Sequence, residues 1–72
     1  MATYGGRGVN ELTQTERRIM ALVADGRTNQ EIADHLRVRP KTVEWNLTKI
    51  YRKLNVTSRN EAVERCRELG LL

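Results

Sequence analysis

The sequence predicts an all-α fold, a four-helix bundle that contains a helix-turn-helix, and three observations lead to this prediction. Apolar residues recur at spacings of three and four, the period of an amphipathic helix. Helix-start signals of the form Ser/Thr-x-x-Glu occur three times. Only about three residues separate the second segment from the third, and so short a turn joins two helices at a steep angle. The predicted helices span about residues 14–25, 29–36, 40–54 and 59–69.

Length and composition limit the chain to one small domain. The 72 residues leave room for a single small core, which we assign to residues 12–72. Residues 1–11 contain three glycines and no periodicity, so they are predicted to form a flexible tail or linker. Because no apolar run is long enough to span a membrane and no signal peptide is visible, a cytoplasmic protein without membrane contact is expected.

The first helix begins with a predicted capping box. Thr13 caps the helix, and Glu16 reaches back to the Thr13 N–H. Gly26 supplies the left-handed residue that ends the helix. The apolar side of this segment consists of Leu12, Ile19, Met20 and Val23.

The second helix has the same start, Thr28 to Glu31. It ends before Pro40, which forces a new helix to begin, and Val38 in the turn is expected to pack into the core. The buried side of this helix is predicted to be Ile32, Ala33 and Leu36.

The third helix is the most informative segment. Pro40 suits its first position, where a missing N–H has no consequence. Its apolar stripe consists of Val43, Leu47, Ile50 and Leu54. Its opposite face collects Lys41, Glu44, Trp45, Thr48 and Arg52, with Lys49 at the edge.

The fourth helix follows a predicted stop at Asn55, a residue that tolerates the left-handed conformation. Val56 is expected to return to the core, and a third capping box, Ser58 to Glu61, starts the helix. Its buried side is predicted to be Ala62, Cys66 and Leu69, with Gly70 ending the helix.

Charge is concentrated on the third helix. Residues 39–54 carry five basic side chains and one acidic one, a net charge of +4 that equals the net charge of the whole chain. A basic, hydrogen-bonding helix face on an otherwise neutral domain is what a reader of the DNA major groove needs. The alternative is a solvated basic face with an isolated Trp.

No residues suggest an enzyme or a cofactor. Glu16 and Glu31 are better explained as helix caps than as a catalytic pair, and no Gly-rich phosphate loop or catalytic triad is present. One histidine, His35, and one cysteine, Cys66, do not make a metal site. We expect His35 on the surface and Cys66 in the core.

A family resemblance rests on a dense set of residues at matching spacings across about residues 12–71. These residues are Leu12-Thr13, Glu16, Gly26, Asn29, Glu31-Ile32-Ala33, Lys41-Thr42-Val43, Leu47, Ile50-Tyr51, Lys53-Leu54, Val56, Arg59 and Ala62-Val63. The chain resembles the LuxR-type (GerE-type) DNA-binding domain. The resemblance implies a four-helix bundle whose third helix enters the major groove and whose fourth helix pairs two domains. Domains of this family usually lie at the C-terminus of transcription regulators, behind a receiver, ligand-binding or ATPase domain.

The chain departs from the family pattern at four positions. Glu44 stands where a basic residue is frequent, and Asn46 stands where His is frequent. Arg39 replaces the usual Ser or Thr cap, and Asn55 replaces the usual Gly. Glu44 changes the expected base preference, because a carboxylate accepts from cytosine N4 and is repelled by phosphate.

The expected contacts with DNA and with a second copy divide into three sets. Phosphate contacts are expected from Thr28, Asn29, Gln30, Lys41, Lys49, Arg52 and Lys53. Base contacts are expected from Glu44, Trp45 and Thr48. Pairing is expected through Asn60, Val63, Glu64 and Arg67. Tyr51 is expected mainly to pack against the core.

The sequence therefore predicts sequence-specific binding to double-stranded DNA in transcription regulation, as a homodimer on DNA through the fourth helix. Missing N-terminal regulatory domains and RNA polymerase are the further partners expected. The alternative is a protein-interaction module, in which the helix of residues 40–54 docks on a partner such as a receiver domain or a polymerase.

Overall fold

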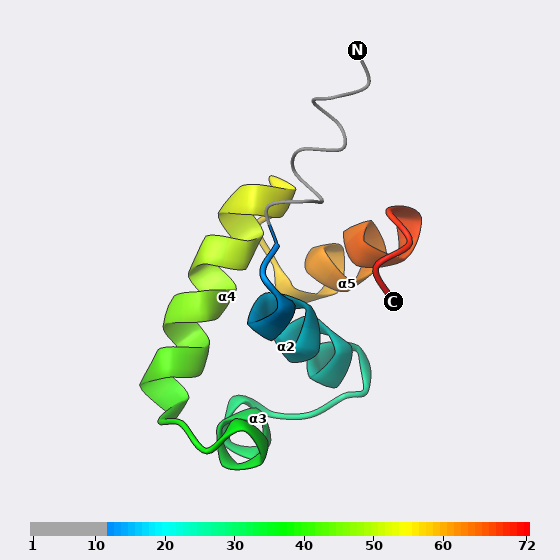
Figure 1. Ribbon diagram of the computed structural model, residues 1–72. Coiled ribbons are helices and arrows are strands. Elements are labelled where there is room, and N and C mark those ends of the chain that lie inside the picture. Colours follow the sequence, from blue (N-terminus) through cyan, green and yellow to red (C-terminus); the bar gives the residue numbers. More distant parts are fainter. Residues whose placement is uncertain (1–11) are drawn as a thin grey trace.

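A computed structural model describes residues 12–72, which form four helices connected by short turns (Figure 1). The helices are α2 (Gln14–Ala24), α3 (Asn29–Leu36), α4 (Pro40–Leu54) and α5 (Arg59–Glu68). The predicted all-α class and all four helices are confirmed, although α2 and α5 each end one residue earlier than expected. The tail or linker predicted for residues 1–11 lies outside the described residues. No helix in the described range has the length and apolarity needed to cross a membrane.

The longest helix, α4, runs along one side of the bundle, and α3 lies across its N-terminal end (Figure 1). α2 lies between α4 and α5 and also packs against α3. The pairs α3–α4 and α4–α5 complete the packing, whereas α3 and α5 do not pack directly on each other. α3, α4 and the short turn between them form the predicted helix-turn-helix.

Two predicted capping boxes are present in full. Glu16 N–H donates to Thr13 Oγ1 at 3.1 Å, and Thr13 N–H donates to Glu16 Oε1 at 2.8 Å. Thr28 and Glu31 make the same reciprocal pair at 3.1 and 2.9 Å. Each box satisfies backbone N–H groups that have no partner within the helix, so it fixes where the helix begins.

The third predicted capping box forms only in half. Ser58 Oγ accepts from the Glu61 N–H at 3.2 Å, but the Glu61 carboxylate does not return to Ser58. It accepts instead from both the N–H and the hydroxyl of Thr57, each at 2.9 Å. Thr57 offers two donors where the Ser58 backbone offers one. These hydrogen bonds from Thr57 lower the pKa of the Glu61 carboxyl.

Left-handed residues end the helices. Gly26 and Asn55 have φ of 84° and 59°, as predicted for helix stops. Arg37, after α3, also adopts this conformation, with φ of 60°. The sequence did not predict it, because a left-handed conformation costs an ordinary residue about 1–2 kcal/mol. Hydrogen bonds from the Arg37 and Val38 N–H groups to carbonyls of the last turn of α3 offset this cost.

The four predicted apolar stripes meet in one core. Its buried residues are Leu12, Ile19, Met20, Val23, Ile32, Ala33, Val43, Leu47, Ile50, Leu54, Ala62 and Cys66. Leu36 and Val56, predicted as core residues, are only partly buried at its edge. Val38 and Leu69 are corrections, because they stay 40% and 39% exposed; both lie just outside the helices, at the surface of the bundle. Burial raises the pKa of the Cys66 thiol, which suits a core residue rather than a nucleophile.

One buried ion pair joins the start of α2 to the end of α4. Glu16 is only 1% exposed, and its two carboxylate oxygens lie 2.9 and 3.2 Å from Lys53 Nζ. Burial alone would raise the pKa of Glu16. The hydrogen bonds from Lys53 and from the Thr13 N–H outweigh burial and hold this pKa below its ordinary value of 4.5.

We expect Leu47→Ala to lower the free energy of unfolding by about 2–5 kcal/mol, because it opens a cavity at the centre of the α4 stripe. Urea denaturation followed by circular dichroism measures this loss. Thr48→Ala, at the next and exposed position, is the matched control and should cost far less. A loss below about 1 kcal/mol for Leu47→Ala would contradict the packing of α4 described above.

We expect acid to weaken the bundle through Glu16. Because the folded-state pKa is lowered, the contribution of this carboxylate is complete above its unfolded-state pKa near 4.5 and is lost as pH falls through the folded-state value. Glu16→Gln should lower the free energy of unfolding at neutral pH by about 1–3 kcal/mol and flatten its fall with acid. Urea denaturation between neutral and acidic pH tests both effects.

The control is Glu64→Gln, which removes an exposed carboxylate and should leave the free energy of unfolding at neutral pH nearly unchanged. Equal acid sensitivity in Glu16→Gln and the unmodified chain would contradict this role.

Candidate nucleic-acid interface

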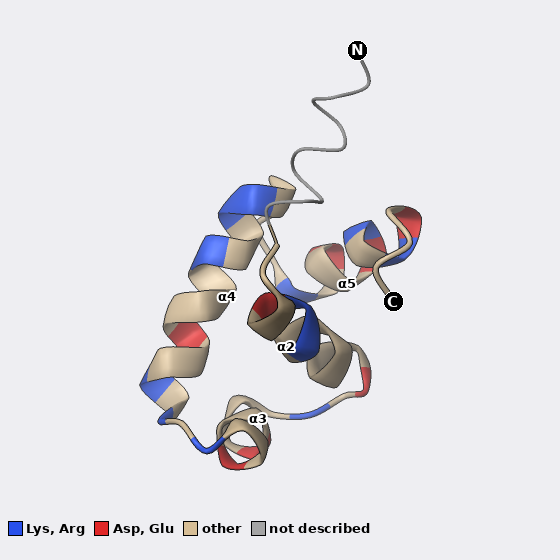
Figure 2. Cartoon of the chain, in the orientation of Figure 1, with Lys and Arg blue, Asp and Glu red and all other residues tan. Residues whose placement is uncertain are grey.

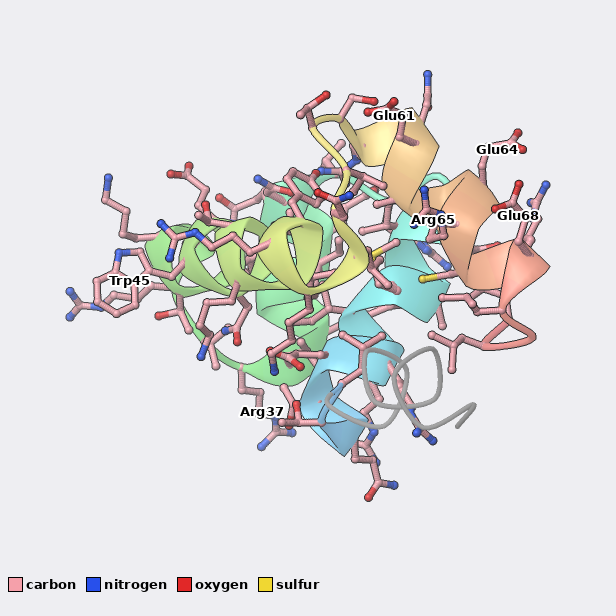
Figure 3. The ribbon with its side chains drawn as sticks, turned by 90° about the horizontal axis from the view of Figure 1, so that it is seen from above. Arg37, Trp45, Glu61, Glu64, Arg65 and Glu68 are labelled. Carbon is pink, nitrogen blue, oxygen red and sulfur yellow. The ribbon has the colours of Figure 1, made fainter. Side chains whose placement is uncertain are left out.

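The rotation of α4 about its own axis decides which side chains reach solvent. Its buried residues are Val43, Leu47, Ile50 and Leu54. At 100° per residue, Trp45 lies almost opposite the centre of that stripe. Trp45 is 71% exposed and projects away from the bundle (Figure 3). A large exposed aromatic on a rigid helix marks a contact surface.

Positive charge follows the same helix. Figure 2 shows basic positions along α4 with a single acidic position among them. Lys41, Lys49 and Arg52 are exposed. The acidic residue, Glu44, lies 3.9 Å from Lys41 in an exposed pair of the kind that contributes little energy. The outer face therefore keeps an excess of cations that are available to an acidic partner.

A groove on the same helix lies beside Trp45. Its lining residues are Lys41, Thr42, Trp45, Asn46 and Lys49. Thr42 and Asn46 were not predicted as contact residues. The signal that could have found them is helical spacing, because they are one turn apart and flank Trp45 on the side opposite Glu44 and Thr48.

Two polar side chains that lie on either side of Trp45 are held by their own helix. The Thr48 hydroxyl donates to the Glu44 carbonyl at 3.1 Å, and Asn46 Nδ2 donates to the Thr42 carbonyl at 2.9 Å. Each side chain keeps its oxygen available as an acceptor. Together with the Glu44 carboxylate they offer acceptors, while Trp45 offers an indole N–H donor. This mixture suits the donor and acceptor pattern of base edges.

The start of α3 gathers the second set of predicted contacts. Thr28 caps the helix, and Gln30 Nε2 donates to Asp34 Oδ1 at 3.0 Å. Asn29 is half-buried, and its Oδ1 accepts from Arg59 Nη1 at 2.8 Å. The first N–H groups of a helix lack intrahelical partners and favour an anion. Thr28 and Gln30 are exposed, so this helix start is open to solvent.

The ammonium of Lys53 lies apart from the exposed cations of α4. Its side chain is 27% exposed, and its ammonium lies against the buried Glu16 carboxylate. Although helical geometry puts Lys53 at the edge of the outer face, its long stem reaches the start of α2, where Glu16 lies. Tyr51 is half-buried and packs against the core, as expected.

The predicted pairing residues lie along one side of α5. Asn60, Glu64 and Arg67 are exposed, whereas Val63 is half-buried against the core. A single partly covered valine among polar neighbours makes a small, polar surface.

The histidine and the cysteine lie apart from the outer face of α4. His35 is exposed on α3, and Cys66 is buried in α5. Within residues 12–72, no group of three or more His, Cys, Asp or Glu side chains is placed to hold a metal ion.

A tight helix-turn-helix whose second helix turns a basic, hydrogen-bonding face to solvent is the architecture of a DNA-binding domain. Residues 10–66 match the family model GerE, described as bacterial regulatory proteins of the luxR family. The chain belongs to this family. It is accordingly a DNA-binding domain of the kind used in transcription regulation, and the family is one of regulators rather than enzymes.

Similar proteins come from several bacteria. ComA, a transcriptional regulatory protein of Bacillus subtilis (strain 168), is 48% identical over 61 residues, which are 85% of this chain and 28% of ComA. YgeK, a response regulatory protein of Escherichia coli (strain K12), is 42% identical over 86% of this chain and 42% of its own length. Rv0890c of Mycobacterium tuberculosis (strain H37Rv), whose name describes an HTH-type transcriptional regulator, is 42% identical over 89% of this chain and 7% of its own length. The chain thus spans less than half of each of these relatives.

Proposed function

We propose that this domain binds specific DNA sites by inserting α4 into the major groove. The observation that carries the proposal is the outer face of α4, where exposed cations surround an exposed Trp45 directly opposite the buried stripe. An α-helix fits the major groove, and only in that groove do all four base pairs present distinct patterns.

Base recognition is assigned to Glu44, Trp45 and Thr48. The Glu44 carboxylate and the Thr48 oxygen are acceptors, which favours the amino groups of cytosine or adenine. The Trp45 ring packs on a thymine methyl or a sugar. Thr42 and Asn46 line the groove beside Trp45 and extend the reading face on its other side.

Phosphate contacts are assigned to Lys41, Lys49 and Arg52 on α4, and to the start of α3. At α3 the contributing residues are Thr28, Asn29 and Gln30. The first-turn N–H groups of Asn29 and Gln30 suit an anion, and Thr28 contributes its hydroxyl. We leave Lys53 out of this set, because its ammonium is held by Glu16.

Two copies are proposed to pair on DNA through Asn60, Val63, Glu64 and Arg67 of α5. Since this surface is small and polar, the isolated domain is expected to be monomeric at micromolar concentration and to pair only on DNA. Support comes from the exposure of three of these four residues.

We also propose that the domain is the DNA-binding part of a longer regulator. The support is its coverage of the relatives named above, which is between 7% and 42% of their length. An attached regulatory domain and RNA polymerase are the partners proposed for the longer protein, which would act in the cytoplasm.

The first test separates base reading from phosphate binding. Trp45→Ala should keep the fold, weaken the best site by about 1–3 kcal/mol and leave the salt dependence of affinity nearly unchanged. Arg52→Ala should weaken all sequences alike and reduce the salt slope by about one. Fluorescence anisotropy over a salt series measures both, using a duplex selected by the unmodified chain and a scrambled duplex.

The same experiment tests the protein-interaction alternative. If the unmodified chain prefers no sequence, and DNA leaves the fluorescence of Trp45 unchanged, α4 does not read bases. Saturable binding of a receiver domain or polymerase subunit to α4 without DNA would then support a protein-docking role.

The second test addresses pairing. The preferred DNA site should contain two half-sites about one helical turn apart, each bound by one copy. Arg67→Glu should abolish cooperative binding to the double site. Its affinity for a single half-site should differ less from that of the unmodified chain than its affinity for the double site does. Arg17→Glu, an equal charge change at an exposed position of α2, is the control and should keep cooperativity. Equal affinity for one half-site and for the best double site would contradict pairing.

A further inference from the structure

Arg59, the first residue of α5, makes two long-range hydrogen bonds with one guanidinium group. Its Nη1 donates to Asn29 Oδ1 at 2.8 Å, and its Nη2 donates to the Arg27 backbone carbonyl at 2.7 Å. The two acceptors lie on either side of Thr28, the residue that caps α3. Because α3 and α5 do not pack directly on each other, this side chain is a bridge between them.

The peptide group between Arg27 and Thr28 is held at both ends. Its carbonyl accepts from Arg59 Nη2, and its N–H donates to Glu31 Oε1 at 2.9 Å. A peptide unit fixed at its donor and its acceptor has little freedom to rotate. The direction in which α3 starts is therefore set by α5 as well as by its own cap.

The same bridge orients the side-chain amide of Asn29. Arginine only donates hydrogen bonds, so the amide oxygen, and not the amide nitrogen, faces Arg59. The Nδ2 group, with its two N–H donors, consequently points away from the guanidinium. Phosphate oxygens only accept, and this orientation presents the group that they can use.

We propose that Arg59 is a positioning residue for DNA binding, which fixes the start of α3 and turns the Asn29 amide N–H groups toward a DNA phosphate. This inference rests on the function proposed above, in which the start of α3 holds a phosphate. It gives α5 a second role, because the helix proposed to pair two copies also holds the phosphate-binding end of α3 in place.

The first variant is Arg59→Lys, which keeps the positive charge but cannot donate to both acceptors in the same planar geometry. Affinity for the selected duplex should fall about tenfold, the size expected for losing a hydrogen bond to a charged group. The salt slope should stay unchanged, because no phosphate contact of Arg59 itself is lost. Thermal denaturation identifies a temperature at which every variant is folded, and affinities are compared there.

The second variant is Asn29→Asp, which separates a DNA role from a structural one. Aspartate still accepts from Arg59 and suits the first turn of a helix, so the free energy of unfolding should be equal or higher. It has no N–H donor and repels phosphate, so DNA affinity should fall by more than tenfold. A side chain that served the fold alone would not separate stability from affinity in this way.

The coupling between the two residues is measured with Asn29→Ala. If Arg59 acts through Asn29, adding Arg59→Lys to Asn29→Ala should cost much less affinity than Arg59→Lys costs in the unmodified chain. The DNA-induced shift of the Asn29 side-chain amide signal in ¹H–¹⁵N spectra should also shrink in Arg59→Lys. Both readouts follow the orientation of the amide rather than global stability.

Three results would overturn the inference. The first is that the affinity losses of Arg59→Lys and Asn29→Ala add fully in the double variant, and the second is that Arg59→Lys binds DNA with normal affinity. The third is a salt slope reduced by one in Arg59→Gln, which would make Arg59 a direct phosphate contact. Arg52→Ala is measured in parallel. If it lowers affinity and salt slope while the Arg59 and Asn29 variants behave as the unmodified chain, the positioning role fails alone. If none of the variants changes DNA binding, the function proposed above fails as well.

Discussion

The structure depends on the apolar stripe that fixes the rotation of α4. Val43 and Ile50 are completely buried, and Leu47 and Leu54 nearly so, which leaves the helix one favourable orientation against α2, α3 and α5. A shift of the stripe by one residue would turn every side chain through about 100° and bring polar residues into the core. The outer face that we propose for DNA binding is therefore specified by packing on the opposite side of the helix.

Polar contacts between helices then hold the helix ends. Glu16 and Lys53 join the start of α2 to the end of α4, and Arg59 joins the start of α5 to the start of α3. A core of this size determines which faces meet but constrains the helix ends less, because ends carry few apolar side chains. The polar contacts act at those ends, and one of them lies beside the proposed phosphate contacts.

The sequence predicted well the features that depend on residues close together in the chain, and poorly the contacts between residues far apart in it. Capping boxes and apolar stripes depend on residues three or four apart, so all four helices and nearly all of the core followed from spacing. The pairs Glu16–Lys53 and Arg59–Asn29 link residues 37 and 30 apart, and no periodicity reveals which long side chains meet. Lys53 shows the consequence, because its helical position indicated solvent while its flexible stem reaches a buried carboxylate. The assigned contacts with DNA remain predictions.

The hydrogen bonds of the α4 outer face have an evolutionary consequence. Thr48 and Asn46 bond to carbonyls of their own helix, and Glu44 pairs only with Lys41 of the same helix. These hydrogen bonds and this ion pair involve no second helix, so variation at Glu44 and Thr48 can alter the proposed reading face without removing a hydrogen bond between helices. Duplicated copies of such a domain can diverge toward new target sites by a few substitutions while their scaffold stays under unchanged selection.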